Sequence, residues 1–121
     1  MIVYIWGNLT ADNFTPRRGK DTMARPGQQA GLSASDAMPT GRKAQGIDIG
    51  KLKAPLKAIP DDTKQGGTRG HFAIAPVNEM GEVDVKQLEA WAMSRGTGQT
   101  HEFTQILLDA VVEPNAKGGT Q

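Results

Sequence analysis

Cysteine is absent from this chain of 121 residues, and aromatic residues make up only 5% of it. The lack of cysteine excludes disulfide bonds, thiolate metal sites and a cysteine nucleophile, and it is compatible with a cytoplasmic site of action. The few aromatic side chains disfavour a stacking surface for single-stranded nucleic acid. No apolar run approaches the ~20 residues of a membrane-spanning helix, and the apolar run at the start is too short for a signal peptide. We therefore expect neither a membrane span nor a signal peptide.

Motifs for nucleotide and metal chemistry are missing as well, since the sequence has no P-loop, no GxGxxG and no HExxH. Its two histidines, His71 and His101, are thirty residues apart and have no neighbouring carboxylate pattern, so we expect no metal cofactor. His101 would lie in the first turn of a helix, which favours a surface or capping role. His71 follows a glycine-rich stretch and begins a predicted strand, as an ordinary strand-end residue or as an acid–base group at the sheet rim.

The net charge of +1 conceals an asymmetry between the two parts of the chain. Residues 1–70 carry eleven Lys and Arg against six Asp and Glu, whereas residues 71–121 carry three against seven. The basic part either attracts an anion, such as a nucleotide pyrophosphate, RNA or an acidic partner, or is simply a solvated surface. Arg17 and Arg18 are the candidates for pyrophosphate binding, because the guanidinium group binds such oxygens in a bidentate manner.

Three stretches rich in apolar and β-branched residues predict strands, at Ile2–Trp6, at residues 43–49 and at residues 71–77. A further stretch at residues 52–59 contains Pro55, which limits it to an edge strand or an extended loop.

Two helices are predicted near the end of the chain, at about residues 84–95 and 101–113. Asp84 followed by Gln87 is a capping-box pattern, and Thr100 is the expected N-cap of the second helix. Apolar residues recur at helical spacing in both, so both are expected to pack on one face of the sheet. The expected buried positions are Val85, Leu88, Trp91, Ala92, Phe103, Ile106, Leu107, Ala110 and Val111.

The fold class that follows is α+β, with a small twisted, mostly antiparallel sheet and two C-terminal helices. A chain of this length fits a single domain over residues 1–121, ending in a frayed polar tail at residues 115–121. Residues 8–31 have no period of either kind and form the most basic stretch, so we expect a mobile, ligand-facing loop there.

Residues 31–39 contain small and polar side chains that allow two interpretations. Ser35 or Asp36 is expected to cap a short helix. Ser33 and Ser35 either serve this local turn chemistry or present hydroxyl groups to a ligand, since small residues let a ligand approach the backbone closely.

The stretch HFAIAPV at residues 71–77 resembles a strand pattern, H-[FY]-x-I-x-P, of the type VI secretion exported toxins of the Pseudomonas kind. GLSASD at residues 31–36 is similar to the Gly-Thr-Ser-x-x-Asp turn of that family, with Leu32 in place of Thr. VYIWGN at residues 3–8 is similar to the first strand of such domains. These stretches are short, and HFAIAPV is the most specific of them.

The resemblance implies an ADP-ribosyltransferase-like fold with a cleft for NAD as substrate and no metal. It also implies a toxin that is delivered into the cytoplasm of a rival bacterium and is neutralised by a cognate immunity protein. Asp36 would lie on the serine turn with Ser33. The residues assigned to the site are Ser33 and His71 as catalytic groups, and Tyr4, Arg17, Arg18 and Ser35 as NAD-binding groups.

The chain departs from the family pattern at two places. Ile5 and Trp6 follow Tyr4 where many transferases have an Arg that holds the NAD pyrophosphate, and no Glu-x-Glu or Gln-x-Glu is evident on a late strand. Two other functions stay open: a ribonuclease toxin that uses His71 or His101 as acid–base groups, and a non-catalytic interaction module of a phage or secretion system.

Overall fold

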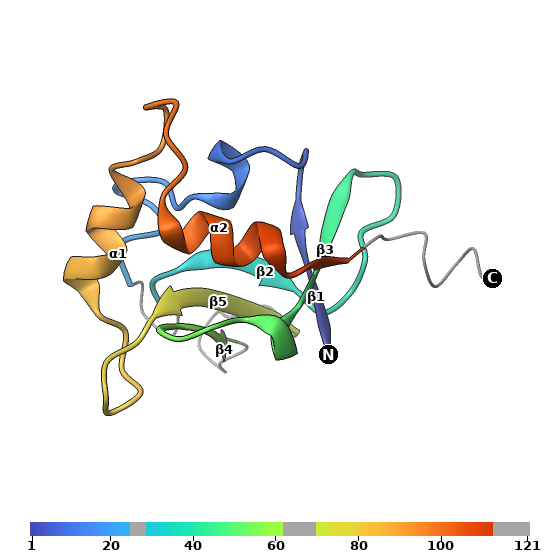
Figure 1. Cartoon of the computed structure of the whole chain (residues 1–121). Helices are drawn as coiled ribbons and strands as arrows, with labels where there is room; N and C mark the ends of the chain where they lie inside the picture. Colours follow the sequence, from blue (N-terminus) through green and yellow to red (C-terminus); the bar gives the residue numbers. More distant parts are fainter. Residues whose placement is uncertain (25–28, 62–69, 113–121) are drawn as a thin grey trace.

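The computed structural model describes residues 1–24, 29–61 and 70–112. They form one six-stranded sheet, two α-helices and two short 3-10 turns, η1 and η2 (Figure 1). Every strand pair is antiparallel, which confirms the predicted α+β class with an antiparallel sheet and two C-terminal helices. In chain order the elements are β1 (Ile2–Trp6), η1 (Asp12–Phe14), β2 (Leu32–Ser35), β3 (Ala44–Asp48), η2 (Ile49–Lys51), β4 (Leu56–Pro60), β5 (His71–Pro76), α1 (Val85–Ala92), α2 (Glu102–Asp109) and β6 (Val111–Val112).

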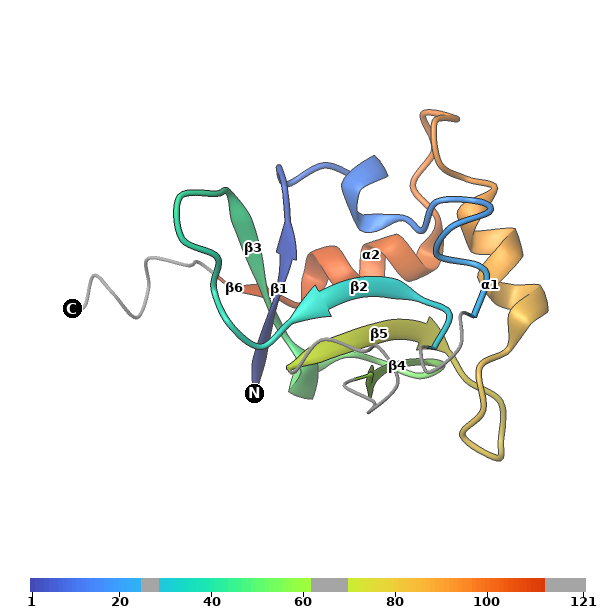
Figure 2. The same ribbon diagram turned by 180° about the vertical axis from the view of Figure 1, so that it is seen from behind.

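The sheet has the strand order β4-β5-β2-β1-β3-β6 and is divided in its middle. Strand β1 pairs with β3 at five positions, and β2 pairs with β5 at four. Between β1 and β2 the only registered pair is Tyr4 with Ser35. Figures 1 and 2 show the consequence, since β1 and β3 run steeply across the direction of β2 and β5. The two halves of the sheet therefore diverge on one side of this single pair.

Alternation along the central strands separates a core face from a polar face. Val3 and Ile5 of β1 belong to the core cluster between sheet and helices, whereas Tyr4, although only 4% exposed, does not. Because side chains alternate along a strand, Tyr4 faces away from the core. The core lies between the sheet and the helices, and α2 crosses the face of the sheet in Figure 1. Its largest fully buried members are Trp91, Phe14, Ile47, Ile74, Leu88, Leu107 and Val3.

The predicted short helix at residues 31–39 is wrong, because Leu32–Ser35 is strand β2. Local capping signals from Ser and Asp were overridden by pairing with β5 on one side and β1 on the other. Gly31 allows β2 to lie directly against β5. It has φ +149°, and a Cβ there would lie 2.9 Å from the carbonyl oxygen of Ile74, so a larger residue would push β2 off β5.

Both predicted helices exist, but each is shorter than expected. Helix α1 ends at Ala92, and α2 ends at Asp109, after which Val111–Val112 pairs with β3 as strand β6. These β-branched residues extend the sheet at an open edge instead of prolonging the helix. The tail predicted at residues 115–121, and Pro114 before it, lie outside the described residues.

The predicted caps and buried positions were partly correct. Asp84 caps α1, and the pKa of its carboxyl group lies below the ordinary value because the side chain and backbone N–H of Gln87 donate to it. The N-cap of α2 is His101, not Thr100, since the His101 ring accepts from the Phe103 N–H. Val85 was expected in the core but is exposed.

Strand β4 lies at the end of the strand order, which confirms the edge position predicted from Pro55. In the described part of the chain, no helix is long and apolar enough to cross a membrane.

The segment at residues 8–31 is not a uniformly free loop, because its first half is anchored in the core. Phe14 is fully buried, and Thr15 is 4% exposed. The Thr104 hydroxyl of α2 lies 2.8 Å from the Thr15 hydroxyl and 3.1 Å from the Phe14 carbonyl oxygen, to which it donates. The same Thr104 oxygen accepts from the indole N–H of Trp91 in α1 at 2.8 Å. One buried hydroxyl thus connects both helices to this segment.

We predict that Thr104→Val lowers the free energy of unfolding by about 1–3 kcal/mol. Valine has nearly the same shape, but it leaves the Trp91 indole N–H and the Phe14 carbonyl group buried without their partner. Urea denaturation measures the change. The control is Thr100→Val, the same substitution at an exposed position just before α2. Equal stabilities of the two variants would contradict the role assigned to Thr104.

Candidate functional site

A pocket of about 500 Å³ lies where β1 and β2 diverge. This volume is within the range of small-molecule sites, which are roughly 300–1,000 Å³. Strands β1 and β2 provide its floor, the segment after η1 provides one wall, and the connection between α1 and α2 adds a side chain. The lining residues are Tyr4, Ile5, Trp6, Asn13, Thr15, Arg17, Asp21, Leu32, Ser33, Ala34, Ser35, His71 and Arg95.

Three of the polar lining residues form a row across the sheet. Tyr4 of β1 pairs with Ser35 of β2, and Ser35 pairs with His71 of β5. Ser33 lies two residues before Ser35 and therefore shares its face of the sheet. These side chains lie on the face opposite the core, where polar groups meet a ligand or water. Sequence motifs from three separate strands are thus brought to one surface.

His71 is held by a carboxylate that sequence reasoning missed. The Asp61 carboxylate lies 3.0 Å from Nδ1 of His71 and also accepts from the Gln29 backbone N–H at 2.8 Å. Asp61 is only 1% exposed, and its own N–H donates to the His71 carbonyl oxygen at 2.8 Å. A carboxylate can only accept hydrogen bonds, so this contact pairs it with the Nδ1–H tautomer of His71. This orients the ring and directs proton exchange to Nε2.

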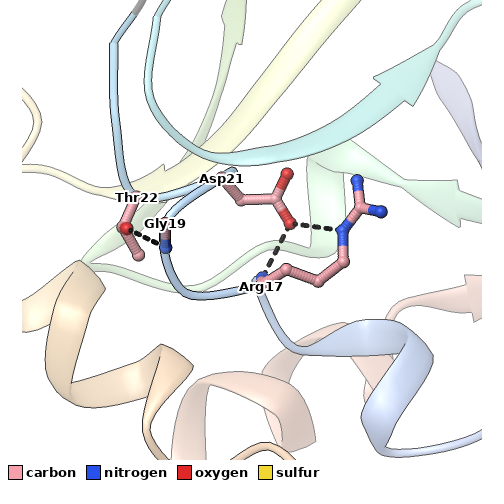
Figure 3. A network of polar contacts seen from close by, with 4 residues as sticks. All are labelled: Arg17, Gly19, Asp21 and Thr22. Atoms are coloured by element: carbon pink, nitrogen blue, oxygen red, sulfur yellow. Dashed lines mark hydrogen bonds and ion pairs between the residues drawn. The ribbon is translucent and has the colours of Figure 1, made fainter.

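Arg17 and Asp21 form a closed turn at the wall of the pocket (Figure 3). Asp21 accepts from the Arg17 backbone N–H at 2.8 Å and lies 3.5 Å from Nε of the same residue. The backbone N–H of Asp21 donates to the Arg17 carbonyl oxygen, and the backbone N–H of Gly19 donates to the Thr22 hydroxyl. Figure 3 shows the two terminal guanidinium nitrogens of Arg17 pointing away from Asp21. The turn fixes the base of the side chain and leaves these donors outside the contact with Asp21.

The pocket thus brings together five of the six residues predicted for the site, Tyr4, Arg17, Ser33, Ser35 and His71. Arg18 is exposed and is not among the lining residues. His101 is also not among them, because it caps α2 and its ring packs edge-on to Phe103 at 4.8 Å between centroids. Asp36, which the resemblance places on the serine turn with Ser33, directly follows β2. Its backbone N–H donates to the Gly70 carbonyl oxygen.

Sequence reasoning also missed the other lining residues, among them Trp6, Asn13 and Arg95. Trp6 is half-exposed, and the Arg42 guanidinium lies 4.7 Å from its ring centroid. Asn13 fastens the wall to the end of β1 by donating to the Trp6 carbonyl oxygen at 2.9 Å. Arg95 comes from the turn after α1. The alternation of β1, which puts Trp6 on the face of Tyr4, was a usable signal for Trp6, but none existed for Arg95.

Comparisons of the chain with protein-family models, curated proteins and solved structures give no match.

We predict that the two histidines adopt opposite neutral tautomers. His71 donates from Nδ1 to Asp61 and so carries its proton there, whereas Nδ1 of His101 accepts from the Phe103 N–H and leaves the proton on Nε2. The ¹⁵N chemical shifts of the ring nitrogens, recorded above the titration range of histidine, distinguish the two forms.

The Asp61→Asn variant sharpens this measurement. Its side-chain oxygen would still accept from the Gln29 N–H, so its amide group would face His71 and donate to Nδ1. The His71 proton should then move to Nε2, while His101 should not change. A wild-type His71 already protonated on Nε2 would refute the assigned geometry.

Proposed function

We propose that this chain is a toxin domain that binds NAD in the pocket between β1 and β2 and either transfers its ADP-ribose or hydrolyses it. The observation that carries the proposal is the convergence of Tyr4, Ser33, Ser35 and His71 on one side of a ligand-sized pocket. The resemblance selected Tyr4, Ser33 and His71 from separate parts of the sequence, and the small polar residues at 31–39 added Ser35. Their meeting in one cavity supports an ADP-ribosyltransferase-like fold.

The chemistry that we assign to the pocket breaks the bond between ribose C1′ and the nicotinamide nitrogen. The bonding electrons leave with nicotinamide, and an oxygen of water or of a target side chain bonds to C1′. The acceptor loses its proton to Nε2 of His71, and Asp61 stabilises the resulting imidazolium. Ser33 and Ser35 bind the nicotinamide side, and Tyr4 contributes its aromatic ring to the floor of the site.

The ribonuclease alternative is less well supported by the arrangement of the histidines. A pair of histidines acting as acid and base must reach the same scissile phosphate. His71 lines the pocket, whereas His101 is used as a helix cap and does not. The interaction module is disfavoured by the buried carboxylate behind His71, which is a common device for orienting a functional histidine.

The proposed function also implies a partner protein and a site of action. A toxin that consumes NAD requires a cognate immunity protein in the cell that makes it, and it acts in the cytoplasm of the cell that receives it.

We predict that the purified protein releases nicotinamide from NAD, alone or in the presence of lysate proteins as acceptors. His71→Asn should reduce the rate by at least about a hundredfold, because it removes the acid–base group. Its amide nitrogen can still donate to Asp61, so the buried carboxylate keeps a partner. Chromatographic quantification of nicotinamide measures both rates.

His101→Asn is the matched control, since it makes the same substitution at the other histidine. Asparagine is a favourable N-cap, so α2 should be retained and the rate should stay at the wild-type level. If wild-type protein leaves NAD intact and instead degrades RNA in a His71-dependent manner, the ribonuclease function replaces the one proposed.

A further inference from the structure

Arg95 is a lining residue of the pocket that neither the resemblance nor the chemistry above uses. It lies in the turn that follows α1, and its side chain is exposed. Among the described lining residues the other arginine is Arg17, which comes from the opposite end of the chain. Two guanidinium groups on one small cavity repel each other unless an anion lies between them.

The turn that carries Arg95 is firmly attached on both sides. The Ser94 hydroxyl donates to the carbonyl oxygen of the fully buried Trp91 at 2.7 Å, and the Arg95 N–H donates to that of Ala92 at 3.1 Å. On the other side, the Gly96 N–H donates to the Asp12 carboxylate of η1 at 2.9 Å. The last contact joins the turn to the segment that leads into Arg17, so the two arginines are held on linked supports.

Among the described residues, the acidic groups near the pocket do not neutralise these cations completely. Asp21 accepts from the Arg17 backbone N–H at 2.8 Å and approaches only Nε of its side chain, at 3.5 Å. Asp61 is committed to His71 and Gln29. The terminal nitrogens of Arg17 point away from Asp21 (Figure 3), so they remain available as donors to a ligand of the pocket that Arg17 lines.

We infer that Arg17 and Arg95 form a diphosphate subsite, which takes the pyrophosphate of a nucleotide. Guanidinium groups bind phosphate oxygens in a bidentate manner, and two of them match the two phosphates of a nucleoside diphosphate. Arg95 then supplies the contact that the absence of an Arg on β1 leaves open. The inference rests on the proposed function for its ligand class, but not on any turnover of NAD.

Calorimetric binding of ADP, AMP and adenosine to the full chain tests the subsite. The wild-type protein should bind ADP more tightly than AMP, and AMP more tightly than adenosine. Arg95→Ala should weaken ADP binding by about tenfold to a hundredfold and leave adenosine binding unchanged. The difference between ADP and AMP should shrink by the same factor, because the second phosphate has lost its partner.

Arg18→Ala is the control, because it removes the same charge beside Arg17 from a side chain that does not line the pocket. It should change ADP affinity less than twofold. Equal losses in the two variants, unchanged ADP affinity in Arg95→Ala, or no ADP binding by the wild type would each overturn the subsite. If ADP binds as inferred and NAD is nonetheless not consumed, the subsite stands and the enzymatic proposal fails.

Discussion

The Thr104 hydroxyl occupies the point where α1, α2 and the segment after η1 meet, and the walls of the pocket depend on it. It accepts the Trp91 indole N–H, donates to the Phe14 carbonyl oxygen and touches the Thr15 hydroxyl, all in a buried environment. Buried polar groups are costly unless each has a partner, so this arrangement is strongly preferred over alternatives. Thr15 itself lines the pocket, and the Arg17 turn follows it directly.

The sheet contributes the other half of the site through a weakness in its own pairing. With a single registered pair between β1 and β2, the strands separate, and residues from both of their faces line the cavity between them. A fully paired sheet would leave no such gap. Rigid strands then hold Tyr4, Ser33, Ser35 and His71, while the Thr104 contacts hold the wall opposite them. Sites built on regular elements in this way keep their geometry when the ligand arrives.

The strands and the two C-terminal helices could be predicted because their signals are local. Ile2–Trp6 and His71–Pro76 are apolar and β-branched, and Asp84 is followed by its capping partner. Strand β2 could not be predicted in the same way, because Leu32–Ser35 becomes a strand only through neighbours far along the chain.

The candidate site shows the same division between local and long-range information. The short motifs located Tyr4, Ser33 and His71, but motifs say nothing about which carboxylate lies behind a histidine. Asp61 follows the last residue of β4, and His71 begins β5, so antiparallel pairing of Pro60 with Phe72 brings them together. Since both strands were candidates in the sequence, their antiparallel pairing could have been proposed from it. The position of Arg95 depends on the hydrogen bond between the turn after α1 and Asp12 of η1, which no pattern in the sequence predicts.

The central claim is that the polar face between β1 and β2 is where NAD binds, and the two tryptophans provide its most direct test. Trp6 lines the pocket and is half-exposed, whereas Trp91 is fully buried and bonded to Thr104. Titration of ¹⁵N-labelled protein with NAD should shift the Trp6 indole N–H signal progressively and leave the Trp91 signal unmoved. An unshifted Trp6 signal at saturating NAD, or shifts confined to residues outside the pocket, would contradict the account.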